Sequence, residues 1–255
     1  EFNHSSADFS LSNSSNGKRI LFLGWSSLGV KILDSISGFL DDKSSVDVVF
    51  IDDYCSSSIV NAQYAFDINF LPVTPDFDLE SKLKDENYDD VMIIGYSDKL
   101  SINEADSFTL LKSLELDSIM RKNNFDCRVL THILNSSKSK LTEITHSKEI
   151  IISDNLSALL MAQLSENHHL YRVFEKLFSS EHSSINIFPI DFYVELEKEI
   201  TYKQVVLAAA NKNHNAVGLL YKNVNTTSHG EGLEVNPKKS MTFTPSKGDS
   251  LIVIS

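Results

Sequence analysis

The sequence predicts an α/β protein with a Rossmann-like parallel sheet domain, a helical crossover connector and a small α+β C-terminal subdomain. From Lys18 onward, short apolar runs alternate with amphipathic stretches, which is the βαβ rhythm of a parallel sheet covered by helices. Near Ser153 this alternation gives way to a leucine stripe with helical spacing, and beyond Ser180 short strand-like runs predominate. The predicted boundaries are therefore 18–152, 153–180 and 181–255, after a Ser- and Asn-rich flexible tail or linker at 1–17.

The first predicted domain consists of strand-like apolar runs and two helices. The strand candidates are 19–25, 46–53, 68–73, 89–98, 128–134 and 149–153. The run at 46–53 is too apolar for a strand with one exposed face, so we expect burial on both faces. Apolar spacings of three and four predict a helix at 28–40. A longer helix is predicted at 101–124, where Ser101 and Glu104 form a capping-box pattern.

The connector and the last subdomain differ in periodicity. Two apolar stripes with helical spacing predict two helices, or one helix broken near 167–169. The stripes are Leu156, Leu159, Leu160 and Leu164, and then Leu170, Val173, Phe174, Leu177 and Phe178. Strands are predicted at 185–190, 217–222, 232–235 and 250–254, with one helix at 202–212 that opens on a Thr201-x-x-Gln204 box. Because a core of about 70 residues is marginal by itself, we expect this subdomain to pack on the connector or on a partner chain.

Composition and charge exclude several classes of protein. The chain has 255 residues, with 23 Lys and Arg against 35 Asp and Glu, and this acidic balance argues against nucleic acid as a partner. Its apolar runs fall far short of the roughly 20 residues that a spanning helix needs. Cys55 and Cys127 form neither a disulfide framework nor a zinc motif. Since the chain begins at Glu1 without a signal-peptide pattern, we expect it to be a fragment of a longer protein.

The first predicted strand–turn–helix segment resembles a dinucleotide-binding loop that has lost its central glycine. A G-x-G-x-x-G fingerprint lets the backbone approach a pyrophosphate at its second glycine. Here Gly24 and Gly29 occupy the first and third positions, but Ser26 occupies the second. The bulky Trp25 is expected to occlude the adenosine crevice. NAD is therefore disfavoured, although the helix N-terminus would still attract an anion such as a nucleotide phosphate.

Polar residues follow two of the predicted strands. Asp52 and Asp53 end the second strand, where a ribose-binding carboxylate would lie, and Tyr96 and Ser97 end the fourth. Ligands of open α/β sheets bind at the carboxyl ends of the strands. These residues, with the glycines of the first loop, are therefore the predicted ligand-binding residues.

Three carboxylates near the fourth strand are candidates for calcium binding. They are Asp98, Glu104 and Asp106, and Ca²⁺ takes six to eight oxygen ligands. The alternative is structural, because Glu104 would cap its helix and Asp106 would interact favourably with the helix dipole. The adjacent His168 and His169 lack the spacing of a zinc pair, and no hydrolase or P-loop motif occurs, so no catalytic residue is predicted.

Several segments resemble the cytosolic part of the CASTOR/POLLUX ion-channel family. The resemblance extends over most of 18–255, and its most specific part is the 45-residue block at 150–194. Other similar segments are ILFLGW at 20–25, YSDKLSINEADSFTLLKSLELDSIMR at 96–121, AVGLLYK at 216–222, the Asn-Pro pair at 236–237 and LIVI at 251–254.

This resemblance implies an RCK, or TrkA-like, regulatory domain of a potassium-type cation channel, without enzymatic activity. Such domains dimerise through their crossover helices and assemble into a ring, tetrameric or octameric, on the cytoplasmic side of a membrane. The pore domain would lie upstream of this chain, and Ca²⁺ or a nucleotide would gate it by shifting the population of states. The residues that the resemblance places toward such a ligand are Gly24, Trp25, Asp52, Asp53, Tyr96, Ser97 and Asp98.

Two alternative functions remain open from the sequence. The first is an NAD(P)-dependent oxidoreductase, which Gly24, Gly29 and the acidic pair after the second strand would support. The second is a stand-alone nucleotide- or ion-sensing subunit that docks on a separate transporter. Hydride-transfer activity would favour the first alternative, and the absence of a fused pore would favour the second.

Overall fold

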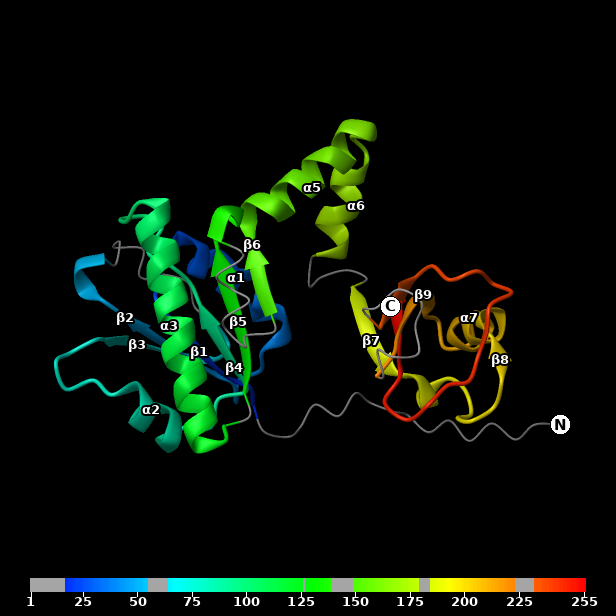
Figure 1. Cartoon of the computed structure of the whole chain (residues 1–255), viewed down its shortest axis with the longest axis horizontal. Helices are drawn as coiled ribbons and strands as arrows, with labels where there is room; N and C mark the ends of the chain where they lie inside the picture. Colours follow the sequence, from blue (N-terminus) through cyan, green and yellow to red (C-terminus); the bar gives the residue numbers. More distant parts are fainter. Residues whose placement is uncertain (1–16, 55–63, 126, 139–148, 179–183, 223–231) are drawn as a thin grey trace. The chain divides into compact units, whose positions relative to one another are not determined.

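The computed structural model describes residues 17–54, 64–125, 127–138, 149–178, 184–222 and 232–255. The chain forms two compact units, one up to Asn167 and one from His168 to Ser255, which we describe separately (Figure 1). The division lies inside the predicted connector at 153–180, so the two connector helices belong to different units.

The first unit is built on a parallel six-stranded sheet with the strand order β3-β2-β1-β4-β5-β6. Its strands are β1 (Arg19–Leu23), β2 (Ser45–Phe50), β3 (Asp67–Pro72), β4 (Asp90–Ile93), β5 (Arg128–Ile133) and β6 (Glu149–Ile152). All five strand pairs are parallel, which confirms the predicted Rossmann-like sheet. The strand order reverses between β1 and β4, and this switch point is where open α/β sheets bind ligands.

Helices cover both faces of this sheet (Figure 1). On one face, α1 (Ser27–Ile36) packs on Ile20 and Phe22 of β1, and on the other face α2 (Leu79–Asp85) and α3 (Ile102–Asn123) pack on Leu21 and Leu23. Because successive side chains of β1 point to opposite faces of the sheet, this one buried strand contributes to two hydrophobic cores. Short 3₁₀ helices follow several elements, namely η1 (Ser37–Phe39), η2 (Asp52–Tyr54) and η3 (Ser136–Lys138).

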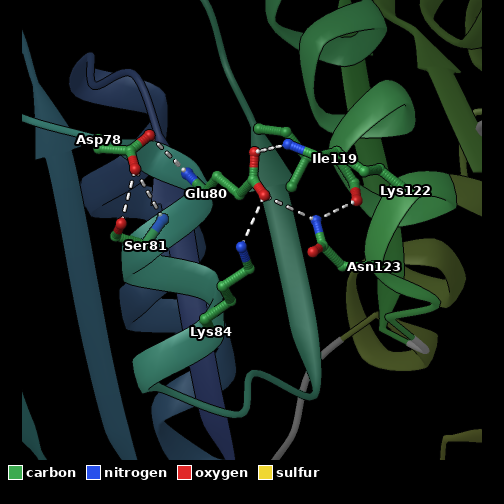
Figure 2. A network of polar contacts seen from close by, with 7 residues as sticks. All are labelled: Asp78, Glu80, Ser81, Lys84, Ile119, Lys122 and Asn123. Atoms are coloured by element: carbon green, nitrogen blue, oxygen red, sulfur yellow. Dashed lines mark hydrogen bonds and ion pairs between the residues drawn. The ribbon is translucent and has the colours of Figure 1, made fainter.

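A polar network fixes α2 against the C-terminal end of α3. Glu80 accepts hydrogen bonds from Lys84 Nζ at 2.7 Å, Lys122 Nζ at 2.9 Å and Asn123 Nδ2 at 3.2 Å (Figure 2). These hydrogen bonds, led by the one from Lys84, lower the pKa of Glu80 to about 2. The N-cap residue of α2 is Asp78, whose carboxylate accepts from the backbone N–H groups of residues 80 and 81. The helix was not predicted, although this N-cap and the pair Leu79 and Leu83 could have indicated it.

The second unit is a small α+β subdomain, as predicted. Its antiparallel four-stranded sheet has the order β10-β9-β12-β7, and β8 pairs with β11. The helix α7 packs through Tyr202, Val205 and Ala209 on residues of β9 and β12. The elements are α6 (Leu170–Leu177), β7 (Ile185–Pro189), η4 (Ile190–Phe192), β8 (Ile200–Thr201), α7 (Tyr202–Ala210), β9 (Asn215–Leu220), β10 (Leu233–Val235), β11 (Thr242–Phe243) and β12 (Ser250–Ile254).

The connector forms two separate helices, which is the first of the two predicted alternatives. Residues 167–169 lie between them. The helices are α5 (Ser153–Glu166) and α6, and neither helix has a buried residue. Large apolar side chains are exposed on both, including Leu159 at 59% and Met161 at 70% on α5 and Tyr171 at 59% on α6. Within the described residues, no helix is both long and apolar enough to cross a membrane.

Candidate functional site

The carboxyl ends of β1, β2 and β4 meet at the switch point of the sheet. Gly24 follows β1 with a φ of +89°, and its N–H donates to the carbonyl of Val49 at 2.9 Å. A Cβ atom at this position would lie 2.0 Å from the carbonyl oxygen of Ile94. Only glycine fits both the backbone angle and this close approach, so the turn after β1 requires Gly24 for a structural reason.

Tyr96 joins the ends of β4 and β2. Its side chain is 1% exposed, and its hydroxyl accepts a hydrogen bond from the N–H of Ile51 at 2.9 Å. The ring contacts Phe108 of α3 at 4.8 Å and Tyr54 of η2 at 5.5 Å between ring centroids. The Tyr96 side chain is thus buried and held in place at this edge, whereas the neighbouring Ser97 is exposed.

A cavity of about 160 Å³ opens at this edge, between the strand ends and the helices α2 and α3. Its polar lining consists of Asp78, Lys112 and Glu115, with Lys112 Nζ 2.7 Å from a Glu115 carboxylate oxygen. The other lining residues are Leu23, Gly24, Val49, Ile51, Val73, Phe77, Leu79, Tyr96 and Phe108. Ligand pockets for drug-sized molecules are usually about 300–1,000 Å³, so this cavity fits an ion or a small molecule better than a dinucleotide.

The prediction that Trp25 occludes the nucleotide crevice is wrong. The indole is 0% exposed and lies in the core beneath α1, where it packs edge-on against Phe22 at 5.7 Å and Phe70 at 5.4 Å. A Cβ atom on Gly29 would come within 2.5 Å of the indole ring. Gly29 therefore accommodates the indole, and Trp25 does not project over the strand ends.

The N-terminus of α1 is in contact with an acidic side chain from a distant part of the chain. The N–H of Ser27 donates to Asp98 Oδ2 at 2.6 Å, and the Ser27 hydroxyl donates to Asp98 Oδ1 at 2.8 Å. Asp98 lies in the exposed turn after β4. One of the three predicted calcium ligands is thus already engaged with the loop that resembles a dinucleotide-binding site.

The other two predicted calcium ligands also have structural partners. Glu104 forms a complete capping box with Ser101, which lowers the pKa of the Glu104 carboxyl through hydrogen bonds from that serine. Asp106 is 1% exposed and accepts from the N–H groups of Leu134 and Asn135 at 2.8 and 3.1 Å. In the described part of the chain, no three His, Cys, Asp or Glu side chains gather into a group that could hold a metal ion.

The acidic pair after β2 is exposed. Asp52 and Asp53 lie in η2, directly beyond the end of the strand and beside Tyr54. They carry negative charge at the same sheet edge as Asp98. The structure thus places most predicted residues at one edge but gives them different surroundings, because Tyr96 is buried and residues 52, 53 and 98 are exposed.

No sequence pattern indicated the residues that line the cavity from α2 and α3. Asp78, Lys112 and Glu115 belong to helices whose packing on the sheet is a tertiary feature. A second arrangement was also missed, in which His132 Nε2 lies 2.6 Å from the hydroxyl of Ser153 at the start of α5. Burial lowers the pKa of His132, while the nearby charge of Asp106 raises it by a smaller amount.

A larger cavity of about 650 Å³ lies at the opposite, amino-terminal edge of the sheet. Three of its charged groups are paired within the protein, since Asp90 accepts from Lys18 Nζ at 2.7 Å and from Arg128 Nε at 2.6 Å. Because ligands of this fold bind at the carboxyl edge, the smaller cavity remains the candidate functional site.

Comparison with known proteins relates the chain to plant ion channels. It is 25% identical over 128 residues to the probable ion channel SYM8 of Pisum sativum, which is 50% of this chain and 14% of the relative. It is 25% identical over 199 residues to the probable ion channel POLLUX of rice, or 70% of this chain and 20% of the relative. The chain is a distant homologue of the CASTOR/POLLUX/DMI1 ion channels. No protein-family model matches it.

The fold of the chain also matches a solved gating ring. The human SLO3 gating ring aligns with 93% of the chain at a TM-score of 0.61 and 15% identity, and the chain covers 44% of that structure. This match shows that the chain shares the fold of that gating ring. The chain spans only 14% and 20% of the SYM8 and rice POLLUX sequences. These relatives are named as ion channels, not as enzymes.

Proposed function

We propose that the chain is the regulatory, gating-ring domain of a potassium-type cation channel and that it has no enzymatic activity. The observation that carries this proposal is the coincidence of distant homology to named ion channels with the fold of a gating ring over 93% of the chain. A pore domain would lie upstream in the full-length protein, with this domain on the cytoplasmic side of the membrane.

We further propose that a small ligand acts at the carboxyl edge of the first unit. Gly24 and Tyr96 form the rigid part of that edge, Asp52, Asp53, Ser97 and Asp98 its exposed part, and the cavity reaches to α2 and α3. A ligand shifts the equilibrium between open and closed states only by its differential affinity for them. No three described acidic side chains of this edge form a metal cluster, but three exposed carboxylates lie there and the cavity is small. A hydrated cation such as Ca²⁺, held partly through water, is therefore the ligand class that we propose.

Calcium is expected to raise the melting temperature of the purified domain, whereas NAD is not. The expected shift is a few degrees at saturating Ca²⁺, because binding to the folded state alone adds about 2.7 kcal/mol at a hundred-fold excess over Kd. Thermal denaturation with millimolar CaCl₂, MgCl₂ or NAD measures this effect. The double variant Asp52→Asn/Asp53→Asn should reduce the calcium effect. A shift with NAD and none with calcium would contradict the proposed ligand class and favour the oxidoreductase.

Self-association of the chain through α5 and α6 is part of the same proposal. Both helices expose large apolar side chains and bury none within the described structure, which is unusual for the surface of a monomer. A two-fold arrangement in which two chains exchange these helices would cover them, and such dimers could assemble into a ring.

The variant Leu159→Glu is expected to weaken dimerisation at least about ten-fold, because a charge would have to enter an apolar interface. Leu159 is 59% exposed, so the fold of each unit should be unaffected. Analytical ultracentrifugation over a range of concentrations measures the dimer dissociation constant. Ser157→Glu, on the same helix and also exposed, serves as the matched charge control. A wild-type protein that stays monomeric at every concentration would refute the proposed interface.

The decisive experiment for the channel assignment is recording from the full-length protein. Potassium currents that respond to the same ligand as the purified domain would support the regulatory role. Currents should lose ligand sensitivity, but not ion selectivity, in the Asp52→Asn/Asp53→Asn variant. A ligand response that is unchanged in this variant would place the regulatory site elsewhere.

A further inference from the structure

We propose that Asp98 is a built-in substitute for a ligand phosphate, which closes the anion-binding N-terminus of α1. In a Rossmann domain this helix terminus receives the pyrophosphate of a dinucleotide. Here the position is taken by a carboxylate of the same chain, so phosphate groups are excluded while the turn at 97–100 stays in place. The proposal concerns a contact within one chain and does not depend on the channel assignment.

The contact has the geometry expected of a bound anion. Both carboxylate oxygens of Asp98 accept a hydrogen bond, one from the N–H of Ser27 at 2.6 Å and the other from the Ser27 hydroxyl at 2.8 Å. Ser27 is the first residue of α1, and no acidic residue lies in the first turn of that helix. The negative charge at the positive end of the helix dipole is therefore supplied by a residue 71 positions away in the sequence.

A second observation points to an anion site that the carboxylate only partly satisfies. Ser26 is the N-cap residue of α1 and stands where the dinucleotide fingerprint has its central glycine. Its side chain is 1% exposed and makes no capping hydrogen bond, and its hydroxyl has no hydrogen-bond partner among the described residues. A buried hydroxyl without a partner is costly, and at this place it is a donor available to a larger anion with more oxygens.

The turn that carries Asp98 is fixed at its two ends and exposed between them. The buried Tyr96 holds its start, with the N–H groups of Lys99 and Leu100 donating to the Tyr96 carbonyl at 3.0 and 2.9 Å. The capping box at Ser101 holds its end. Residues 97–99 are exposed. Neutralising Asp98, or drawing its carboxylate toward a bound cation, would leave the start of α1 open to an anion.

Binding of inorganic pyrophosphate to Asp98 variants tests this inference. The wild-type protein is expected to show no binding by calorimetry. Asp98→Ala is expected to bind pyrophosphate at least about ten-fold more tightly than the upper limit that the wild-type measurement sets on its affinity. In ¹H–¹⁵N spectra, the Ser27 amide should shift with pyrophosphate in the variant only. Asp98→Asn keeps the shape of the side chain and should show a smaller gain. Asp76→Asn removes the same charge from an exposed residue that follows β3 and should behave like the wild type.

Two outcomes would overturn the proposal. The first is wild-type binding of pyrophosphate as tight as that of Asp98→Ala, because the carboxylate would then exclude nothing. The second is a folded Asp98→Ala or Asp98→Asn protein that binds pyrophosphate no better than Asp76→Asn, because Asp98 would then be only a helix cap. A failure to bind calcium would count against the proposed ligand of the channel domain but would leave this result unchanged.

Discussion

Replacing Trp25 with alanine is expected to destabilise the first unit by about 3–5 kcal/mol. The indole is fully buried between α1 and the sheet and packs on aromatic residues of β1 and β3. Its removal would leave a large cavity that the rigid parallel sheet cannot fill by collapse. A smaller side chain here would therefore weaken the fold, not create a nucleotide site.

Equilibrium unfolding in urea followed by far-UV circular dichroism measures this loss. Fluorescence is unsuitable, because Trp25 is the single tryptophan of the chain. Phe39→Ala serves as a control, since this aromatic side chain in the same unit is 66% exposed and should matter little. A Trp25→Ala protein whose transition midpoint matches that of the control would show that the indole does not support the core.

The effects of substitutions at Gly29 and Trp25 on stability are expected to be coupled. Gly29→Ala should cost about 1–3 kcal/mol in the wild-type background, because the added Cβ would meet the indole at 2.5 Å. In a Trp25→Leu background the same substitution should cost much less, since the ring is gone. The double-mutant cycle measures this coupling directly. An equal cost in both backgrounds would mean that Gly29 is required for another reason.

Replacing Asp47 with alanine is expected to destabilise the first unit by about 3 kcal/mol. Asp47 lies in the middle of β2 and is 5% exposed, yet it accepts hydrogen bonds from Tyr88, Asn69 and Lys82. Its removal would leave the Lys82 ammonium and the Tyr88 hydroxyl without their acceptor in a largely buried place. Asp67→Ala, an exposed change on the neighbouring β3, should change stability by less than about 0.5 kcal/mol.

The same residue should contribute to acid sensitivity. Burial raises the pKa of Asp47, but hydrogen bonds from Lys82, Tyr88 and Asn69 outweigh it and hold the pKa below its usual value. A lowered carboxyl pKa adds stability that is complete above about pH 4 and is lost as the pH falls through the folded-state value. Urea unfolding between pH 2 and about pH 6 should therefore show a shallower acid loss in Asp47→Asn than in the wild type. Identical slopes would contradict this assignment.

Periodicity predicted the first unit well because each predicted strand is a short apolar run with helices on both faces. The strand order was not predicted, because no local pattern records which strands pair and right-handed βαβ connections allow several orders. The α2 helix escaped prediction because it is only seven residues long. The ends of β1 and β4 were predicted too far along the chain, because the residues beyond them, Trp25 and Tyr96 among them, are as apolar as the strands.

The sequence by itself determined the sheet, the two capping boxes, the broken connector and the family resemblance, because these depend on local spacing and on which residues are apolar. Only the tertiary structure decided where the indole of Trp25 points and what Asp98 contacts. A side chain in a turn can pack inward or outward, and a carboxylate can meet any donor that folding brings to it. Those choices depend on residues tens of positions away, which no local pattern records.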